Sequence, residues 1–66
     1  MKVTVNGEDR SVAQDCSVDD LAGGMGVGPR GVAVAVNGEV VPRSAWPATP
    51  LHDGDRVELL GAMQGG

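Results

Sequence analysis

Apolar and polar residues alternate at the start of the chain. Positions 1, 3 and 5 are apolar and positions 2 and 4 are polar, which is the period of a strand buried on one face. The dipeptide Asn6-Gly7 follows, and this pair favours the type I′ turn of a β-hairpin. The pattern predicts a first hairpin whose return strand, 8–13, is weakly apolar and lies at an edge of the sheet.

The period changes to that of a helix after Ser17. Apolar residues at 18, 21, 22 and 25 share one face of a helix. Ser17 and Asp20 have the spacing of a capping box. Gly23 and Gly24 each lower helix stability by roughly 1 kcal/mol relative to Ala. We therefore expect a short helix, followed by a glycine-rich connection over 26–31.

The second half of the chain returns to strand patterns. Val and Ala alternate over 32–36, so this strand is apolar on both faces and fits the inside of a sheet, with its valines toward the helix. Asn37-Gly38 predicts a second hairpin turn. The return strand 39–41 ends at Pro42 or lies at an edge of the sheet, because Pro42 lacks the N–H that a strand pairing needs.

Three more elements are expected before the end of the chain. A single helical turn fits 44–47, a tight turn fits Asp53-Gly54, and a last strand fits 56–60 with Val57 and Leu59 pointing inward. Together the elements predict an α+β fold, a mixed four- to five-stranded sheet with one main helix packed on one face.

Length and composition limit what such a fold can contain. A chain of 66 residues makes one small domain, which we place at 1–62, with a flexible C-terminal tail at 63–66. One Cys cannot close an internal disulfide, and one Cys with one His makes a poor zinc site. We therefore expect no metal and no cofactor bound by this chain.

Charge and hydropathy exclude further classes of partner. The net charge is −4 and the chain has no Phe or Tyr, whereas nucleic-acid binding needs a basic face or stacking aromatics. No apolar run is long enough for a membrane span, and the start lacks the apolar core of a signal peptide. We expect a cytoplasmic protein that contacts neither nucleic acid nor membrane.

The reactive side chains do not form a catalytic set in the sequence. Cys16 has only His52 as a conceivable base, and we interpret Cys16 as partly buried and His52 as a surface residue; the alternative for Cys16 is a thiol activated by the helix N-terminus. Asp53 and Asp55 fit a turn better than a cation site. Trp46 is interpreted as a lid on the core.

Arg43 has two interpretations that the sequence leaves open. It either anchors its own loop or contacts a carboxylate of a partner.

The diglycine at the end of the sequence is the remaining feature. Gly65 and Gly66 are either part of a frayed terminus or a thin segment that threads into a cleft of another protein. The four residues 63–66 span at most about 14 Å when extended. A carboxylate on Gly66 is ionised at neutral pH, which makes it a poor acyl electrophile, and it must be activated before a nucleophile can attack it. Since the sequence holds no P-loop, a partner would activate it.

The sequence resembles the ThiS family over essentially its whole length. The resemblance lies in VNGE at 5–8, SVDDL at 17–21, AVAVNGEVVPRSAW at 33–46 and DGDRVELLGAMQGG at 53–66. Members of the ThiS family are sulfur carrier proteins of thiamine thiazole biosynthesis. The resemblance implies that this chain has their ubiquitin-like β-grasp fold.

The resemblance also implies a carrier cycle in which this chain is a protein co-substrate, not an enzyme. A ThiF-like adenylating enzyme would use ATP and Mg²⁺ to convert the Gly66 carboxylate to an acyl-adenylate. A cysteine desulfurase or persulfide system would supply sulfur for a thiocarboxylate, and a ThiG-like thiazole synthase would accept that sulfur. Gly65 and Gly66 would enter the partner, and Leu60, Ala62 and Met63 would belong to the docking surface.

Three alternatives remain at the sequence level. The small subunit of molybdopterin synthase uses the same chemistry for another cofactor, although VPRSAW and the short length favour the thiamine carrier. A ubiquitin-like protein modifier would join Gly66 to lysines of other proteins. A β-grasp interaction module would have an inert tail.

Overall fold

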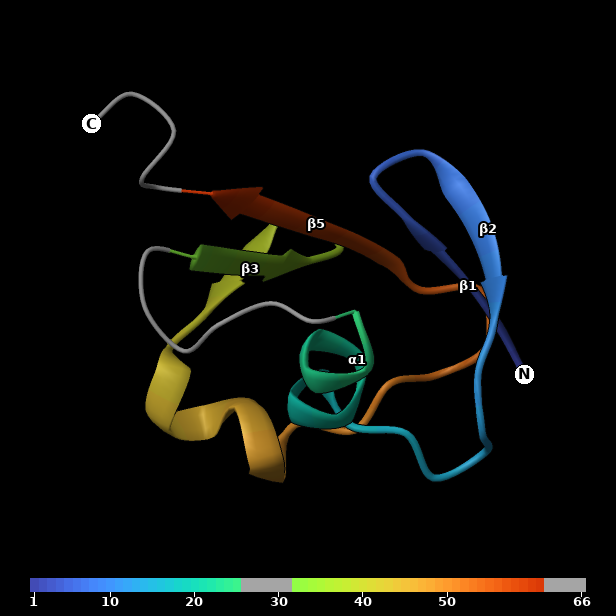
Figure 1. Cartoon of the computed structure of the whole chain (residues 1–66), viewed down its shortest axis with the longest axis horizontal. Helices are drawn as coiled ribbons and strands as arrows, with labels where there is room; N and C mark the ends of the chain where they lie inside the picture. The colour runs from blue at the N-terminus through green and yellow to red at the C-terminus, as the bar shows by residue number, and fades with distance from the viewer. Residues whose placement is uncertain (26–31, 62–66) are drawn as a thin grey trace.

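The computed structural model describes residues 1–25 and 32–61. Seven elements follow one another within these two ranges (Figure 1). They are the strands β1 (Lys2–Val5) and β2 (Glu8–Ser11), the helix α1 (Val18–Gly24), the strands β3 (Val32–Val36) and β4 (Glu39–Val41), the 3₁₀ helix η1 (Arg43–Ala48) and the strand β5 (Arg56–Gly61). The expected tail at 63–66 and the connection at 26–31 lie outside the described residues.

Both predicted hairpins are present, and both turn at Asn-Gly. Asn6 and Asn37 have φ of 51° and 52°, and the glycines after them have φ of 84° and 88°. Positive φ at both central positions defines the type I′ turn. β2 ends at Ser11, two residues before the predicted end, but Val12 still exchanges backbone hydrogen bonds of 2.8 Å with Met1.

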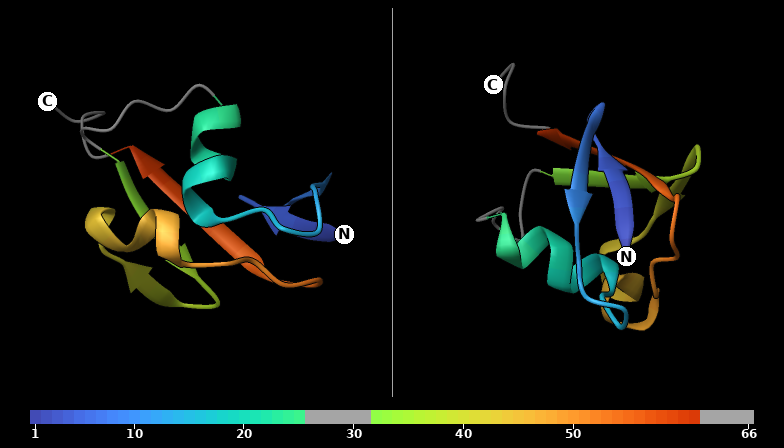
Figure 2. Two further views of the ribbon diagram at one scale, coloured as in Figure 1. Left: turned by 90° about the horizontal axis from the view of Figure 1, so that it is seen from below. Right: turned by 90° about the vertical axis from the view of Figure 1, so that its right-hand side faces the viewer.

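The five strands form one mixed sheet in the order β2-β1-β5-β3-β4. The last strand, β5, lies in the middle, parallel to β1 and antiparallel to β3. The edges are β2 and β4, as the sequence predicts. Figures 1 and 2 show α1 on one face of this sheet. The strand order and the single main helix confirm the ubiquitin-like β-grasp fold, with five strands.

The capping box begins α1 at the predicted residue. The Ser17 hydroxyl accepts a hydrogen bond from the backbone N–H of Asp20 (3.1 Å), and the Asp20 carboxylate accepts one from the N–H of Ser17 (3.1 Å). Val18, Leu21 and Ala22 are buried. A cap of this kind contributes about 1 kcal/mol, which matters in a seven-residue helix that ends in two glycines.

The core consists mainly of small aliphatic side chains from the sheet and from α1. Valines of β1, β3 and β5 meet the apolar face of α1, and Val57 on the central strand is fully buried. Valine and alanine alternate in β3 with the valines on the core side, as predicted, since Val34 is buried and Ala33 is exposed. The buried members are Val3, Val5, Cys16, Val18, Leu21, Ala22, Val34, Trp46, Leu51 and Val57.

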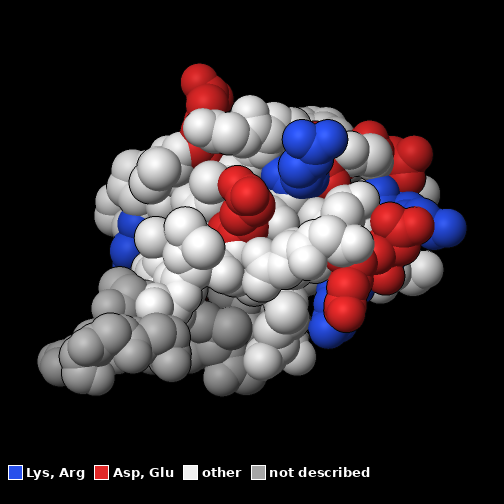
Figure 3. Space-filling model, turned by 90° about the horizontal axis from the view of Figure 1, so that it is seen from above, with Lys and Arg blue, Asp and Glu red and all other residues white. Residues whose placement is uncertain are grey.

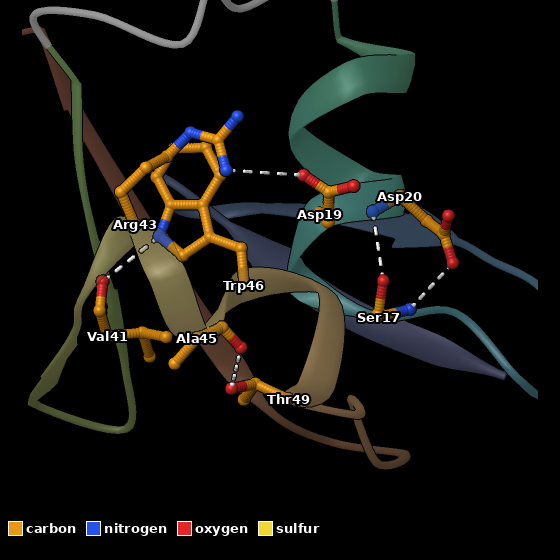
Figure 4. A network of polar contacts seen from close by, with 8 residues as sticks. All are labelled: Ser17, Asp19, Asp20, Val41, Arg43, Ala45, Trp46 and Thr49. Atoms are coloured by element: carbon orange, nitrogen blue, oxygen red, sulfur yellow. Dashed lines mark hydrogen bonds and ion pairs between the residues drawn. The ribbon is translucent and has the colours of Figure 1, made fainter.

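Trp46 closes the core from η1, and Arg43 covers it (Figure 4). The indole N–H of Trp46 donates to the carbonyl oxygen of Val41 (3.0 Å), which satisfies its one polar atom. The Arg43 guanidinium lies 4.7 Å from the centre of the Trp46 ring and 3.8 Å from a carboxylate oxygen of Asp19. Arg43 therefore anchors its own loop to α1, which is one of the two interpretations open from the sequence.

Within the described ranges, no helix has both the length and the apolar character that crossing a bilayer demands.

Candidate functional site

The candidate site lies at the carboxyl end of β5. Of the predicted site residues, Leu60 is described, and its side chain is 62% exposed. Ala62, Met63, Gly65 and Gly66 lie outside the described residues. The structure therefore shows the strand that leads to the predicted reacting end, and the surface around the last residues of that strand.

β5 is held differently along its two sides. Its pairing with β3 extends from Val36↔Val57 to Val32↔Gly61, the last residue of the strand. Its parallel pairing with β1 stops at Val5↔Val57, because the chain turns away at Asn6-Gly7. The strand thus has one fully paired side and one side whose last residues have lost their backbone partner.

Asn6 contacts β5 beyond the end of this pairing. Its side-chain oxygen accepts from the N–H of Leu59 (2.9 Å), and its side-chain nitrogen donates to the carbonyl oxygen of Leu59 (3.3 Å). Sequence reasoning assigned Asn6 only to a turn. No local signal predicts this contact, because the two residues are 53 positions apart in the chain.

An exposed apolar patch adjoins the end of β5, on the sheet face away from α1. Leu60 lies opposite Ala33 across the β3–β5 pair, and Ala35 lies opposite Val40 across the β3–β4 pair. Directly opposed residues share a face, so these four side chains form one surface, here called the outer patch (Ala33, Ala35, Val40 and Leu60). Val40 is 73% exposed. Leu60 is among the residues that the family resemblance implies. Val40 is not, because its place on the same surface as Leu60 depends on the long-range pairing of β3 with β5.

Charge is unevenly distributed over the same face. Figure 3 shows charged side chains gathered on the right, over the β1–β2 hairpin, and few of them on the left. Glu58 lies opposite Ala35 and is the acidic neighbour of the outer patch on β5. An exposed apolar surface next to charged groups is typical of a protein–protein contact.

Cys16 and His52 do not form a catalytic pair. Cys16 lines a cavity of about 240 Å³ between β2 and α1, and His52 lines a different one of about 380 Å³ beside β4. Burial raises the pKa of the Cys16 thiol, and the carboxylates of Asp20 and Asp15 raise it further. The raised pKa argues against the alternative of an activated thiol, since only the thiolate is a strong nucleophile.

The acidic turn before β5 is structural. Asp53 accepts from the backbone N–H of Lys2 (2.8 Å), and Asp55 accepts from the N–H of His52 (2.7 Å). The His52 side chain is 76% exposed, as predicted. In residues 1–25 and 32–61, no three His, Cys, Asp or Glu side chains gather in a way that would hold a metal ion.

A family model, a curated relative and a solved structure all match this chain to the ThiS family. The model of the ThiS family matches residues 3–66. The sulfur carrier protein ThiS of Thermus thermophilus is 41% identical over 64 residues, which are 97% of this chain and 98% of that protein. A crystal structure of the thiamine biosynthesis protein ThiS from Geobacter metallireducens superposes with a TM-score of 0.84 at 42% identity, over 100% of both chains.

A second kind of relative is much longer than this chain. The thiazole synthase of Paramagnetospirillum magneticum is 39% identical over 66 residues, which are 100% of this chain and 20% of that protein. The chain thus spans about a fifth of the length of this synthase.

Proposed function

The chain belongs to the ThiS family, and we propose that it is a sulfur carrier protein of thiamine biosynthesis that acts as a co-substrate and not as an enzyme. The observation that carries the proposal is the family match, which includes the diglycine at 65–66. Two relatives named as sulfur carriers, from Thermus thermophilus and Escherichia coli, are matched over 98% and 100% of their own length.

The reacting group in this proposal is the carboxylate of Gly66. It attacks the α-phosphate of ATP in a ThiF-like adenylating enzyme, pyrophosphate leaves, and an acyl-adenylate forms. ATP and Mg²⁺ are bound by that enzyme, and this chain binds no cofactor. Gly65 and Gly66 suit a narrow active-site channel, because residues without Cβ make the thinnest backbone.

Sulfur then replaces one oxygen of the carboxylate. The terminal sulfur of a cysteine persulfide, formed by a desulfurase, attacks the acyl carbon and AMP leaves. A thiol reduces the resulting acyl disulfide, which gives the thiocarboxylate of Gly66 and a second disulfide. A ThiG-like thiazole synthase takes up the sulfur and the carboxylate is regenerated. Sequence similarity to two named thiazole synthases supports this choice of acceptor.

The outer patch serves as the docking surface in this scheme, together with Ala62 and Met63, which follow β5 in the sequence. Leu60 and Val40 are large apolar side chains that water contacts over most of their surface. Covering them in a complex is favourable by about 25 cal/mol per Å² of apolar area removed from water. The patch adjoins the end of the strand that leads to Gly66, so docking there would bring the reacting end to the partner.

Intact mass spectrometry tests the proposal. The chain is incubated with the adenylating enzyme, ATP, Mg²⁺, a desulfurase with cysteine, and a thiol. We expect the mass gain of one oxygen replaced by one sulfur, located at Gly66. A variant without Gly66 is the matched control and should stay folded and unmodified. No mass gain in the full chain, with adenylating enzyme shown to be active on another carrier, would overturn the proposal.

The relatives reported above carry names from thiamine biosynthesis, which favours this pathway over molybdopterin synthesis. Co-purification distinguishes the two, since each carrier would retain its own synthase. Isopeptide adducts of Gly66 on cellular proteins would instead indicate a protein modifier, and activity that survives removal of both glycines would indicate an interaction module.

A further inference from the structure

The last residues of β5 need a partner that β1 does not provide. A parallel strand alternately donates to and accepts from its neighbour, and on this side the N–H of Asn6 donates to the carbonyl oxygen of Val57 (2.9 Å). The next rung requires an acceptor for the N–H of Leu59 and a donor for its carbonyl oxygen. The backbone of β1 has already turned away into Asn6-Gly7.

The carboxamide of Asn6 supplies both groups of that missing rung. Its oxygen accepts from the N–H of Leu59 at 2.9 Å, and its nitrogen donates to the Leu59 carbonyl at 3.3 Å. A carboxamide carries the same donor and acceptor as a peptide group. The side chain therefore extends the β1–β5 ladder by one rung, although the main chain has left the sheet.

Few residue types satisfy both requirements at position 6. The backbone has φ of 51°, which Gly, Asn and Asp tolerate better than other residues. Gly has no side chain to offer, and Asp lacks the N–H donor and would face the Leu59 carbonyl with an oxygen. Asn combines the turn conformation with the donor and the acceptor.

We propose that Asn6 is a positioning residue for the reacting end of this chain. It fixes Leu59, two residues before the chain leaves β5 at Gly61, and β3 fixes the same stretch from the other side. The direction in which the chain leaves the sheet is thus set on both sides of the strand. The functional part of this inference rests on the proposed activation of Gly66, whereas the effect of Asn6 on Leu59 can be measured without it.

Asn37 provides a matched control within the same molecule. It occupies the same position of the same turn type, with φ of 52°, and it also contacts β5. Its side-chain oxygen accepts from the N–H of Arg56 (3.0 Å), and its side-chain nitrogen donates to the Asp55 carboxylate (3.0 Å). These contacts lie at the beginning of β5, remote from Gly61.

The experiment compares Asn6→Asp and Asn6→Gly with Asn37→Asp and Asn37→Gly. Amide hydrogen exchange, followed by NMR under native conditions, reports on residue 59. We expect Asn6→Gly, which removes both hydrogen bonds, to speed exchange at Leu59 by roughly three- to tenfold, the factor that one net hydrogen bond represents. Asn6→Asp keeps an acceptor for the Leu59 N–H and loses only the donor, so it should speed exchange less, and the Asn37 variants should leave it unchanged. Equal effects from both positions, or none from Asn6, would overturn the structural half of the inference.

Steady-state adenylation kinetics with the adenylating enzyme test the functional half. Mispositioning of the reacting end should lower kcat by about tenfold, while KM, which depends on docking of the outer patch, changes less than twofold; these are order-of-magnitude expectations for lost alignment. The Asn37 variants should keep the wild-type kcat. A fall in kcat that is equal for both asparagines would refute positioning by Asn6. If the wild-type chain is not adenylated, the proposed function fails, and the exchange data still decide the role of Asn6 in the strand.

Discussion

At the scale of single residues, the surroundings of Cys16 decide what its thiol can do. The side chain is buried, and it lies near the carboxylates of Asp15 and Asp20. Burial and these negative charges both disfavour the thiolate, so the pKa of Cys16 is raised from its ordinary value. Its position before a helix is not enough to activate it, and it behaves as a small apolar core residue.

The raised pKa of Cys16 predicts a loss of stability in alkali. The thiol ionises more readily in the unfolded chain, whose pKa is lower, so its contribution is complete below that pKa and is lost as pH rises through the folded value. We expect the free energy of unfolding, from urea titrations followed by Trp46 fluorescence, to fall as the pH rises above about 8.5, the ordinary pKa of a thiol.

Cys16→Ala isolates this effect from other groups that titrate in the same range. The variant should lose about 1 kcal/mol at neutral pH through removal of the packed sulfur, and it should lose less stability than the wild type as the pH rises. Parallel pH profiles for the two proteins would contradict the assignment.

At the scale of elements, α1 depends on its cap more than a longer helix would. The helix has seven residues, ends in Gly23-Gly24 and is too short to be stable alone. Ser17→Ala removes the acceptor for the N–H of Asp20 and should lower the free energy of unfolding by about 1 kcal/mol. Ser17→Asp retains a capping oxygen and should lose less.

Ser11→Ala is the surface control for this prediction, because Ser11 is exposed on the edge strand β2. It should change stability by less than about 0.5 kcal/mol. Urea unfolding measures all three variants, and a loss in Ser17→Ala no larger than that in Ser11→Ala would show that the cap is dispensable.

The elements differ in how far their sequence predicts them. The Asn-Gly turns and the start of α1 at Ser17 were predictable, because the chemistry that specifies them lies within two to four neighbouring residues. The place of β5 between β1 and β3 was not predictable from its own pattern, since strand order depends on pairing between distant segments. The contact of Asn6 with Leu59 was not predictable for the same reason, because it joins residues that are 53 positions apart.

The candidate site also combines features that local sequence predicts with features that depend on distant segments. Alternation in β5 puts Val57 and Leu59 inward and therefore Leu60 outward. The addition of Val40 to the same surface depends on two strand registers. The Asn37-Gly38 turn sets the β3–β4 register locally, whereas the β3–β5 register joins distant segments and no pattern within either strand specifies it. The family resemblance implies the reacting glycines, and the structure describes the surface around the last residues of β5.

At the scale of the whole molecule, the residues that form the core and those of the proposed docking surface lie on opposite faces of the sheet. The face of the sheet toward α1 holds the buried valines, and the opposite face carries Val40 and Leu60 in contact with water. Substitutions in the outer patch should therefore affect binding much more than folding. This separation is what allows docking to be tested in a chain of only 66 residues.

Leu60→Asp and Val40→Asp test the outer patch as the docking surface. Each places a carboxylate where the proposal puts an apolar contact, and burying an unpaired charge is strongly unfavourable. We expect KM for adenylation to rise at least about tenfold, equivalent to 1.4 kcal/mol, while the free energy of unfolding changes by less than about 1 kcal/mol because both side chains are exposed.

Gln14→Asp is the control for charge alone. Gln14 is exposed in the connection between β2 and α1, so the variant has the same net charge as the other two without altering the outer patch. Long-range attraction to a partner depends on net charge, and the control should share any effect of that kind. If all three variants raise KM equally, the cause is electrostatic and docking does not use this face. A rise confined to Leu60→Asp and Val40→Asp, with kcat retained at saturation, locates the contact at the outer patch.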